Sequence, residues 1–324
     1  MKKKRTRIVV IGGGTGLSTI LRGLKQHPFD ITAIVTVADD GGSSGRLRDD
    51  YDIPPPGDVR NVIAALSDVE PLVEQMFQYR FSQSEELNGH SLGNLMLTAL
   101  TDITGDFNHA IAEMSKVLNV HGKVVPAANK KVTLHAELND GSVITGESKI
   151  PSNHLPIKRV FLDPENVKPL PAAIHAIELA DYILIGPGSL YTSIIPNLLV
   201  KGIGQAIVRA KGEKIYIANL MTQRGETIHY TASEHIEALH RHVGQPFVES
   251  MLINATPFPS AVYEHYREEN AEPVKFDVEK LESMGIKIIQ KEIARIHKGV
   301  VRHDATNLAD WLWDYSLQKQ QPTY

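Results

Sequence analysis

The sequence predicts an α/β protein with a doubly wound, mainly parallel, Rossmann-like sheet and a small antiparallel β insertion. Three observations lead to this fold class. Residues 8–16 read IVVIGGGTG, an apolar strand that runs into a glycine turn and then into a helical pattern. Strand-like apolar runs alternate with helical patterns along most of the chain, which is typical of parallel sheets. Between about residues 131 and 162 apolar and polar residues alternate instead, as in antiparallel strands.

Composition narrows the class of protein. The 324 residues fit one Rossmann-like domain over residues 1–324, with the β insertion at about 120–164. The chain has no cysteine, which excludes disulfides and thiolate metal sites and fits a cytoplasmic location. Its net charge of −4 argues against nucleic acid as a partner. No stretch is long and apolar enough to predict a transmembrane segment.

The first glycine turn is the strongest functional signal. A turn between a buried strand and a helix exposes backbone N–H groups at the positive end of the helix dipole, where a phosphate binds. The spacing matches the dinucleotide fingerprint only in part, because Leu17 stands where the last glycine is expected. Close strand–helix packing alone remains the alternative. The candidate ligand-binding residues here are Gly12, Gly13, Gly14, Thr15 and Gly16.

The second predicted strand, residues 31–37, leads to two adjacent carboxylates, Asp39 and Asp40. An acidic residue at this strand end holds a ribose hydroxyl in dinucleotide folds. Asp39 and Asp40 are equally candidates for a Mg²⁺ ligand or a catalytic base, and ordinary turn carboxylates are the alternative.

Residues 41–61 predict a long loop, because they are rich in Gly, Ser, Pro and charge. Asp58 is the expected N-cap of a helix over 59–67, and further helices are expected over 71–81, 92–103 and 107–118. Ser91 is expected to cap the helix at 92. Asn94 in its first turn either faces a ligand or only follows the cap.

The insertion predicts a hairpin with an Asp140-Gly141 turn, followed by a third strand at 157–162. We expect it to lie away from the ligand crevice and to serve packing or self-association, as a homodimer.

Strand and helix patterns resume at about residue 172, with strands expected at 182–185, 214–218 and 250–254. Helices are expected at 172–179, 197–209, 233–242 and 305–318, with Ser233 and Asp304 as expected caps of the last two. The histidines of the helix at 233–242 predict a solvated face. Two strand ends add candidate ligand-binding residues at the carboxyl edge of the sheet. They are Gly186, Pro187, Gly188, Ser189, Tyr191, Thr192 and Ser193 of a second glycine turn, then Asn219 and Thr222.

The C-terminal third offers Tyr266 as an aromatic surface for a base or sugar, and Arg302 as a bidentate partner for a diphosphate. A surface tyrosine and an arginine paired with Glu268 or Asp304 are the alternative.

Six motifs resemble one known family over nearly the whole chain. They are GGGTG (12–16), TVADDGGSSGRLR (36–48), PPGDVRN (55–61), GHSLGNL (89–95), GPGSLYTSI (186–194) and NLMTQRGET (219–227). Together they resemble the YvcK-type gluconeogenesis factors of the CofD-like superfamily. CofD moves a phospholactyl group from a guanosine diphosphate-activated donor to a deazaflavin alcohol with Mg²⁺. Here GGSSGRLRDD replaces the CofD segment around the acceptor, and GPGSL replaces its Gly-Pro-Ser-Asn-Pro.

The resemblance implies a cytoplasmic, regulatory factor that binds a nucleotide or UDP-sugar, with no established reaction. It also implies a need for this factor in cell shape and in growth on gluconeogenic carbon sources. Cell-wall synthesis or regulatory proteins are the implied partners. No cofactor is obligatory, although Mg²⁺ could accompany the ligand. A CofD-like transferase is the first alternative, and an enzyme binding NAD(P), or a similar dinucleotide, is the second.

Overall fold

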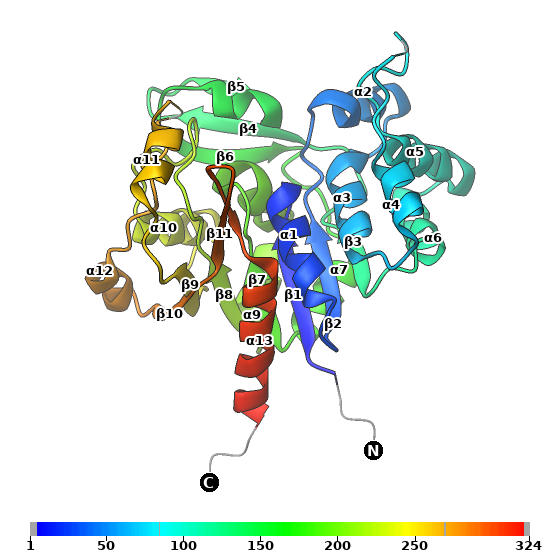
Figure 1. Cartoon of the computed structure of the whole chain (residues 1–324). Helices are drawn as coiled ribbons and strands as arrows, with labels where there is room; N and C mark the ends of the chain where they lie inside the picture. Colours follow the sequence, from blue (N-terminus) through cyan, green and yellow to red (C-terminus); the bar gives the residue numbers. More distant parts are fainter. Residues whose placement is uncertain (1–4, 84, 269, 321–324) are drawn as a thin grey trace.

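The computed structural model describes residues 5–83, 85–268 and 270–320 (Figure 1). Its centre is a seven-stranded sheet in the order β10-β9-β8-β7-β1-β2-β3, with every neighbouring pair parallel. The strands are β1 (Arg7–Gly12), β2 (Asp30–Val35), β3 (Lys123–Pro126), β7 (Tyr182–Ile185), β8 (Glu213–Ile217), β9 (Ser250–Asn254) and β10 (Lys287–Lys291). From β1 the chain adds β2 and β3 on one side of the sheet and then β7 to β10 on the other side. This change of side between β1 and β7 confirms the Rossmann-like fold and is its switch point.

Alternate side chains of the sheet strands enter two separate cores, so these strands read as continuous apolar runs. Ile8 and Val10 of β1 pack towards one set of helices. This set is α1 (Gly14–Leu24), α3 (Pro56–Leu66), α4 (Pro71–Gln78), α5 (Leu92–Thr104), α6 (Phe107–Val117) and α13 (Ala305–Gln320). Val9 and Ile11 pack towards the other set. It is α7 (Pro171–Leu179), α8 (Ile195–Leu199), α9 (Ile203–Arg209), α10 (Ala232–Val243) and α12 (Val278–Ser283).

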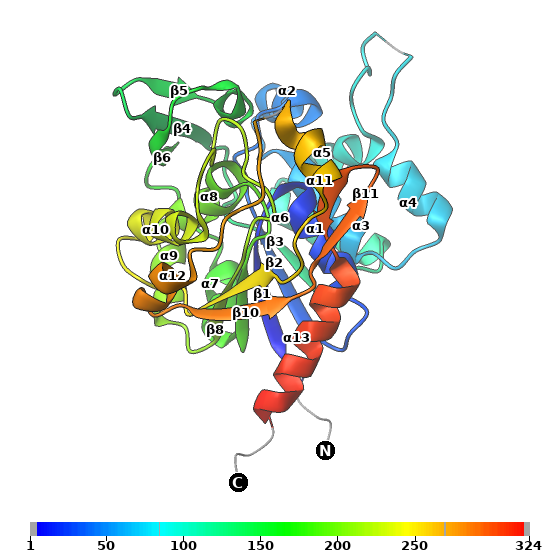
Figure 2. The same cartoon turned by 60° about the vertical axis from the view of Figure 1, so that its left-hand side comes forward.

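The predicted insertion is a three-stranded antiparallel sheet in the order β5-β4-β6. It comprises β4 (Thr133–Leu138), β5 (Val143–Thr145), the 3-10 helix η1 (Glu147–Ser152) and β6 (Ile157–Asp163). Residues 123–126, expected within the insertion, form β3 of the parallel sheet. Figures 1 and 2 show the small sheet and α2 (Gly42–Tyr51) at the end of the molecule opposite to the last turn of α13.

Two further elements lie at the carboxyl edge of the large sheet. One is α11 (Ser260–Arg267), and the other is an antiparallel ribbon of β11 (Ala294–His297) and β12 (Val300–His303). No helix in the described part of the chain is long and apolar enough to cross a membrane.

Several local predictions are wrong, each for a tertiary or stereochemical reason. The expected loop at 41–61 contains α2, because burial of Ser43, Ser44 and Arg48 outweighs the low helix propensity of its glycines and aspartates. The helix expected from Asp58 begins earlier, at Pro56, where proline suits the first turn. The helix expected over 197–209 is interrupted, because Gly202 adopts a φ of 94°.

The expected solvated histidine face of α10 is also wrong. The helix begins at Ala232, with Thr231 rather than Ser233 as its N-cap. His235 is fully buried, and its Nδ1 donates to the Thr231 carbonyl. His242 accepts a hydrogen bond from the Val160 amide of the small sheet, 3.0 Å away. These rings therefore join α10 to its surroundings instead of facing solvent.

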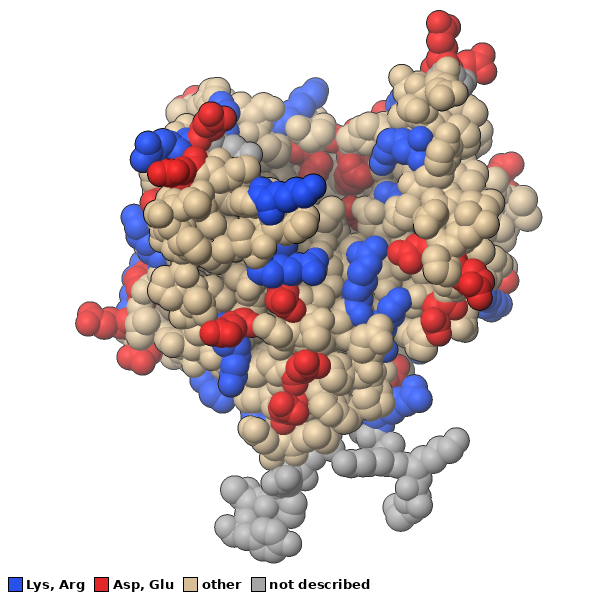
Figure 3. Space-filling model, viewed as in Figure 1, with Lys and Arg blue, Asp and Glu red and all other residues tan. Residues whose placement is uncertain are grey.

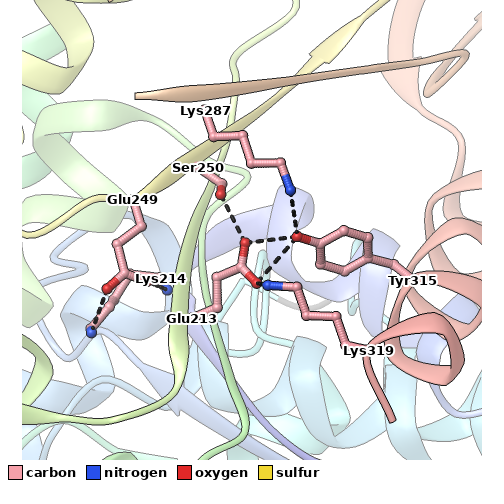
Figure 4. Close-up of polar contacts among 7 residues, drawn as sticks. All are labelled: Glu213, Lys214, Glu249, Ser250, Lys287, Tyr315 and Lys319. Carbon is pink, nitrogen blue, oxygen red and sulfur yellow. Dashed lines mark hydrogen bonds and ion pairs between the residues drawn. The ribbon is translucent and has the colours of Figure 1, made fainter. Parts of the chain in front are cut away.

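The C-terminal half of α13 is held to the sheet by a polar cluster around Glu213, at the start of β8 (Figure 4). The Glu213 carboxylate accepts hydrogen bonds from Ser250 (2.8 Å), Tyr315 (2.9 Å) and Lys319 (2.5 Å). Lys287 donates to the Tyr315 oxygen at 3.1 Å. Burial alone would raise the pKa of Glu213, but these donors hold it below its ordinary value.

This cluster gives a prediction for stability. Glu213→Gln should lower the free energy of unfolding by about 1–3 kcal/mol, because a largely buried, charge-assisted acceptor is lost. Lys319→Ala should cost less, about 0.5 kcal/mol, because that side chain is half exposed. Urea unfolding measures both values. A Glu213→Gln cost no larger than that of Lys319→Ala would contradict the central role of Glu213.

Candidate functional site

The two glycine turns meet at the switch point of the sheet. Gly13 and Gly14 link β1 to α1, and the turn at 186–189 links β7 to a π-helical segment, Leu190–Ile194. A Cβ atom on Gly16 would lie 2.7 Å from the Pro187 carbonyl oxygen, so only glycine lets the turns approach this closely. Both turns therefore border the same space at the carboxyl edge of the sheet.

A cavity of about 560 Å³, which we call the switch-point cavity, opens between these turns and the C-terminal elements. Its size lies within the range of small-molecule sites. Twelve of the candidate residues predicted from the sequence line it. They are Gly13, Gly14, Thr15, Gly16, Pro187, Gly188, Ser189, Ser193, Asn219, Thr222, Tyr266 and Arg302.

The remaining candidates lie outside the cavity lining. Gly12 ends β1 with its carbonyl bound by Asn197, and Gly186 takes a φ of 82° at the turn. Asn94 follows the Ser91 cap as predicted. Its side chain, however, lies in a buried network, accepting from Arg60 at 2.9 Å and donating to Ser43 at 3.1 Å. These contacts favour the structural interpretation of Asn94.

Tyr191 and Thr192 also point away from the cavity. The Tyr191 amide and the Thr192 hydroxyl both donate to the carboxylate of Glu226, each at 2.9 Å. The Tyr191 hydroxyl lies 2.8 Å from that of Tyr230, and the Tyr191 side chain is fully buried. The π-helical winding turns these side chains into the core, which local sequence pattern does not reveal.

The cavity has two chemically different ends. At one end the start of α1 and the second glycine turn offer backbone amides, with the hydroxyls of Ser189 and Ser193. The other end is apolar, with Leu220, Tyr266 and Val301 in one small buried cluster. Tyr266 is 8% exposed, so its ring forms part of the wall.

Two exposed arginines, Arg224 and Arg302, line the cavity, and neither forms an ion pair within the described part of the chain. The alternative pairing of Arg302 with Glu268 or Asp304 is therefore wrong. Arg295 lies directly opposite Arg302 in the β11–β12 ribbon and is likewise unpaired there. Like charges that face each other across a ribbon are unfavourable without an anion.

An acidic hollow adjoins the glycine turns; we use this name for Asp39, Asp40, Asp58 and Glu147. Figure 3 shows acidic side chains on the floor of a depression, with lysine and arginine side chains beside it. The Asp39 carboxylate accepts from the Gly41 amide, and that of Asp40 accepts from the Ser148 amide, each at 2.9 Å. Asp39 also accepts a hydrogen bond from the Ser44 hydroxyl, whereas Asp40 keeps one oxygen that the Ser148 amide does not occupy.

Burial and mutual repulsion hold protons in the hollow. Burial, followed by the charges of Asp39 and Asp58, raises the pKa of Glu147 to about 8. Burial, followed by the charge of Asp39, raises the pKa of Asp58 to about 7. Burial also raises the pKa of Asp39. At neutral pH the hollow therefore carries fewer charges than its composition suggests.

The insertion takes part in this site, so the prediction that it lies away from the crevice is wrong. Glu147 and Ser148 belong to η1, and Pro151 lines the switch-point cavity. The contact is held by the bond between Ser148 and Asp40 and by the close approach of Gly225 to the Pro151 backbone.

Asp58, Glu147, Arg224 and His303 are site residues that sequence reasoning did not select. Asp58 and Arg224 stand inside two of the six motifs, so the motifs themselves carried that signal.

Within the described residues, no three Asp, Glu, His or Cys side chains are grouped to hold a metal ion.

Comparisons with known proteins find relatives over nearly the whole chain. The family model described as 2-phospho-L-lactate transferase CofD matches residues 8–294. The gluconeogenesis factor of Bacillus subtilis (strain 168) is 58% identical over 311 residues, which cover 96% of this chain and 98% of that protein. The gluconeogenesis factor of Halalkalibacterium halodurans is 56% identical over 310 residues, 96% of each chain.

Two crystal structures from Bacillus halodurans are similar to this fold. One has a TM-score of 0.94 at 55% identity and covers 96% of this chain and 100% of that chain. The other, of a UPF0052 family member, has a TM-score of 0.93 at 54% identity with the same coverage.

The acidic hollow gives a pH-dependent prediction. Because the pKa of Glu147 is raised on folding, its stabilising contribution is complete below about pH 4.5 and is lost as the pH rises through about 8. Glu147→Gln should therefore raise the melting temperature at pH 8.5 by a few degrees. This corresponds to a gain of ~1–2 kcal/mol in the free energy of unfolding, after allowing for the partial exposure of the side chain. At pH 5 the variant and the wild type should melt together.

Differential scanning fluorimetry at the two pH values measures this effect, with the exposed Glu282→Gln as the matched control. Equal behaviour of the two variants at pH 8.5 would show that Glu147 is not strained by its neighbours.

Proposed function

The chain belongs to the CofD family and to its gluconeogenesis-factor branch. We propose that it is a regulatory factor that binds a nucleoside diphosphate sugar, and that a UDP-sugar is the preferred ligand. The observation that carries the proposal is the lining of the switch-point cavity, which combines two glycine turns with two arginines that form no ion pair and, among the described residues, includes no carboxylate. Such a lining suits a diphosphate.

The apolar end of the cavity and the neighbouring acidic hollow supply the other contacts. The apolar end, with Tyr266 and Val301, suits a nucleoside. The acidic hollow suits a sugar, because partly protonated carboxyl groups both donate to hydroxyls and accept from them. Mg²⁺ would be held by the diphosphate together with Asp40, which has an oxygen that its amide partner leaves free, or with Asp39, whose carboxylate also accepts from the Ser44 hydroxyl. The metal would supply charge neutralisation.

We extend to this chain the role implied by the family branch: a cytoplasmic factor for growth on gluconeogenic carbon sources and for cell shape. Homodimer formation and contacts with cell-wall synthesis or regulatory proteins belong to the same proposal. Light scattering tests the dimer, and growth of a deletion strain on gluconeogenic carbon sources tests the cellular role.

A ligand screen by thermal shift tests the binding function. UDP, GDP, UDP-sugars and NAD are compared at equal concentration, and a UDP-sugar should stabilise the protein most. A hundredfold excess over Kd stabilises by about 2.7 kcal/mol. Stabilisation by none of the nucleotides would refute the proposal. Strongest stabilisation by NAD would favour the dinucleotide alternative. One observation argues against that alternative: Asp39, the expected ribose partner, lies outside the cavity lining.

The arginines give a direct prediction. Arg302→Ala and Arg224→Ala should each weaken binding of UDP at least about tenfold, because a charged contact to a diphosphate is worth a few kcal/mol. Isothermal titration calorimetry measures the affinities. Arg267→Ala, an exposed arginine of α11 outside the cavity lining, is the control and should bind normally. Unchanged affinity in both cavity variants would confine the site to the sheet edge.

The transferase alternative is favoured by one feature, the pKa of about 8 at Glu147 beside the glycine turns, which suits a proton-transferring group. Prolonged incubation with UDP-sugar or GDP and analysis by mass spectrometry tests for turnover. A regulatory factor should return the ligand intact. Turnover that Glu147→Gln abolishes, with binding retained, would instead establish an enzyme.

A further inference from the structure

His303 offers the cavity a hydrogen-bond acceptor of fixed orientation. It ends β12 and lines the switch-point cavity. Its Nε2 lies 3.0 Å from the Ala218 carbonyl oxygen. A carbonyl oxygen only accepts, so Nε2 carries the hydrogen and Nδ1 carries a lone pair. Nδ1 has no hydrogen-bond partner within the described residues, and it is not among their buried, unsatisfied atoms. The lone pair is therefore available to a ligand.

The ring is held neutral and in place. Burial lowers the pKa of His303 to about 4, so it stays uncharged at neutral pH. On one side, the Val301 amide donates to the Tyr266 hydroxyl oxygen at 3.0 Å, which joins β12 to α11. On the other side, Asp304 caps α13 through the amides of Thr306 and Asn307, both at 3.0 Å. The acceptor is thus positioned before any ligand arrives.

A neutral acceptor cannot bind a phosphate. Phosphate oxygens present lone pairs of their own, so a bond to Nδ1 would need a proton, and the diphosphate of a nucleoside diphosphate sugar, esterified at both ends, holds none at neutral pH. Asn219, which also lines the cavity, is already occupied: its amide donates to the Gly188 carbonyl, and its oxygen accepts from Tyr216. His303 therefore marks a part of the cavity that excludes phosphate and accepts from an N–H or O–H group.

We propose that His303 accepts a hydrogen bond from the nucleoside half of the ligand, a ribose hydroxyl or the imino N–H of the base, and so fixes which way round the nucleotide lies. The diphosphate then lies at the glycine turns, and the nucleoside lies towards Tyr266 and Val301. This inference rests on the proposed nucleotide binding and adds a specificity-determining residue to it.

Calorimetric titration with two probes, UDP and inorganic pyrophosphate, tests the proposal. His303→Phe keeps a flat ring but removes the acceptor, so it should weaken UDP binding about three- to tenfold, the worth of one neutral hydrogen bond. Pyrophosphate affinity should stay within twofold. His297→Phe, on the exposed strand of the same ribbon, is the matched control and should leave both affinities unchanged.

Ligand analogues identify the donor, and their comparison in the wild type needs no variant. The wild type should lose affinity for one of 2′-deoxy-UDP, 3′-deoxy-UDP and N3-methyl-UDP, and His303→Phe should bind that analogue as it binds UDP. His303→Leu, which also lacks an acceptor, repeats the test if the phenylalanine variant fails to fold.

The outcomes separate the two proposals. Equal UDP affinity in the wild type and the His303 variants, or no loss with any analogue, would overturn the role of His303 alone. Equal loss of UDP and pyrophosphate would also overturn it, because His303 would then act at the phosphate end. Absence of UDP binding to the wild type would overturn the nucleotide function itself.

Discussion

The contact between the two glycine turns is the constraint on which the rest of the crevice depends. Strand order places β1 beside β7, so Gly16 meets the Pro187 carbonyl with no room for a Cβ atom. Fully buried Asn197 joins the turns, because its amide donates to the carbonyls of Gly12 (3.1 Å) and Ser193 (2.8 Å). Backbone atoms rather than side chains therefore shape this part of the cavity, and the backbone amides of the two turns remain available to bind an anion.

Charge divides the crevice in a way that matches an asymmetric ligand. Arg224 and Arg302 stand at the cavity without carboxylate partners, whereas Asp39, Asp58 and Glu147 crowd together close by. A dianion is attracted to the first region and repelled from the second. The hollow relieves its own repulsion by keeping protons, which makes it a polar surface of low charge. A molecule with a charged diphosphate and an uncharged, hydroxyl-rich group satisfies both regions.

Sequence pattern was sufficient for features that local chemistry decides. The glycine turn at 12–16, the buried strands and the caps at Ser91 and Asp304 all follow from neighbours in the chain. It failed where distant segments decide. Helix α2 forms because burial of Arg48 and its bond to Thr133 outweigh its glycines. Glu147 reaches the site only because the insertion folds back onto Asp40, and no local pattern reports that contact.

Helix α2 bears on the choice between binding and transfer. It is built from GGSSGRLRDD, the segment that replaces the region around the acceptor in CofD. Ser43 bonds to His90 and Asn94, and Arg48 reaches the Asp39 carbonyl and Thr133 of the insertion. Arg48 therefore fixes Asp39 and the small sheet to each other, and Ser43 ties α2 to the start of α5, so both side chains are engaged within the protein. Ser43 and Arg48 are therefore committed to bracing the crevice, and a second substrate of the transferase alternative would have to contact the other polar side chains of α2, such as the exposed Arg46 and Asp50.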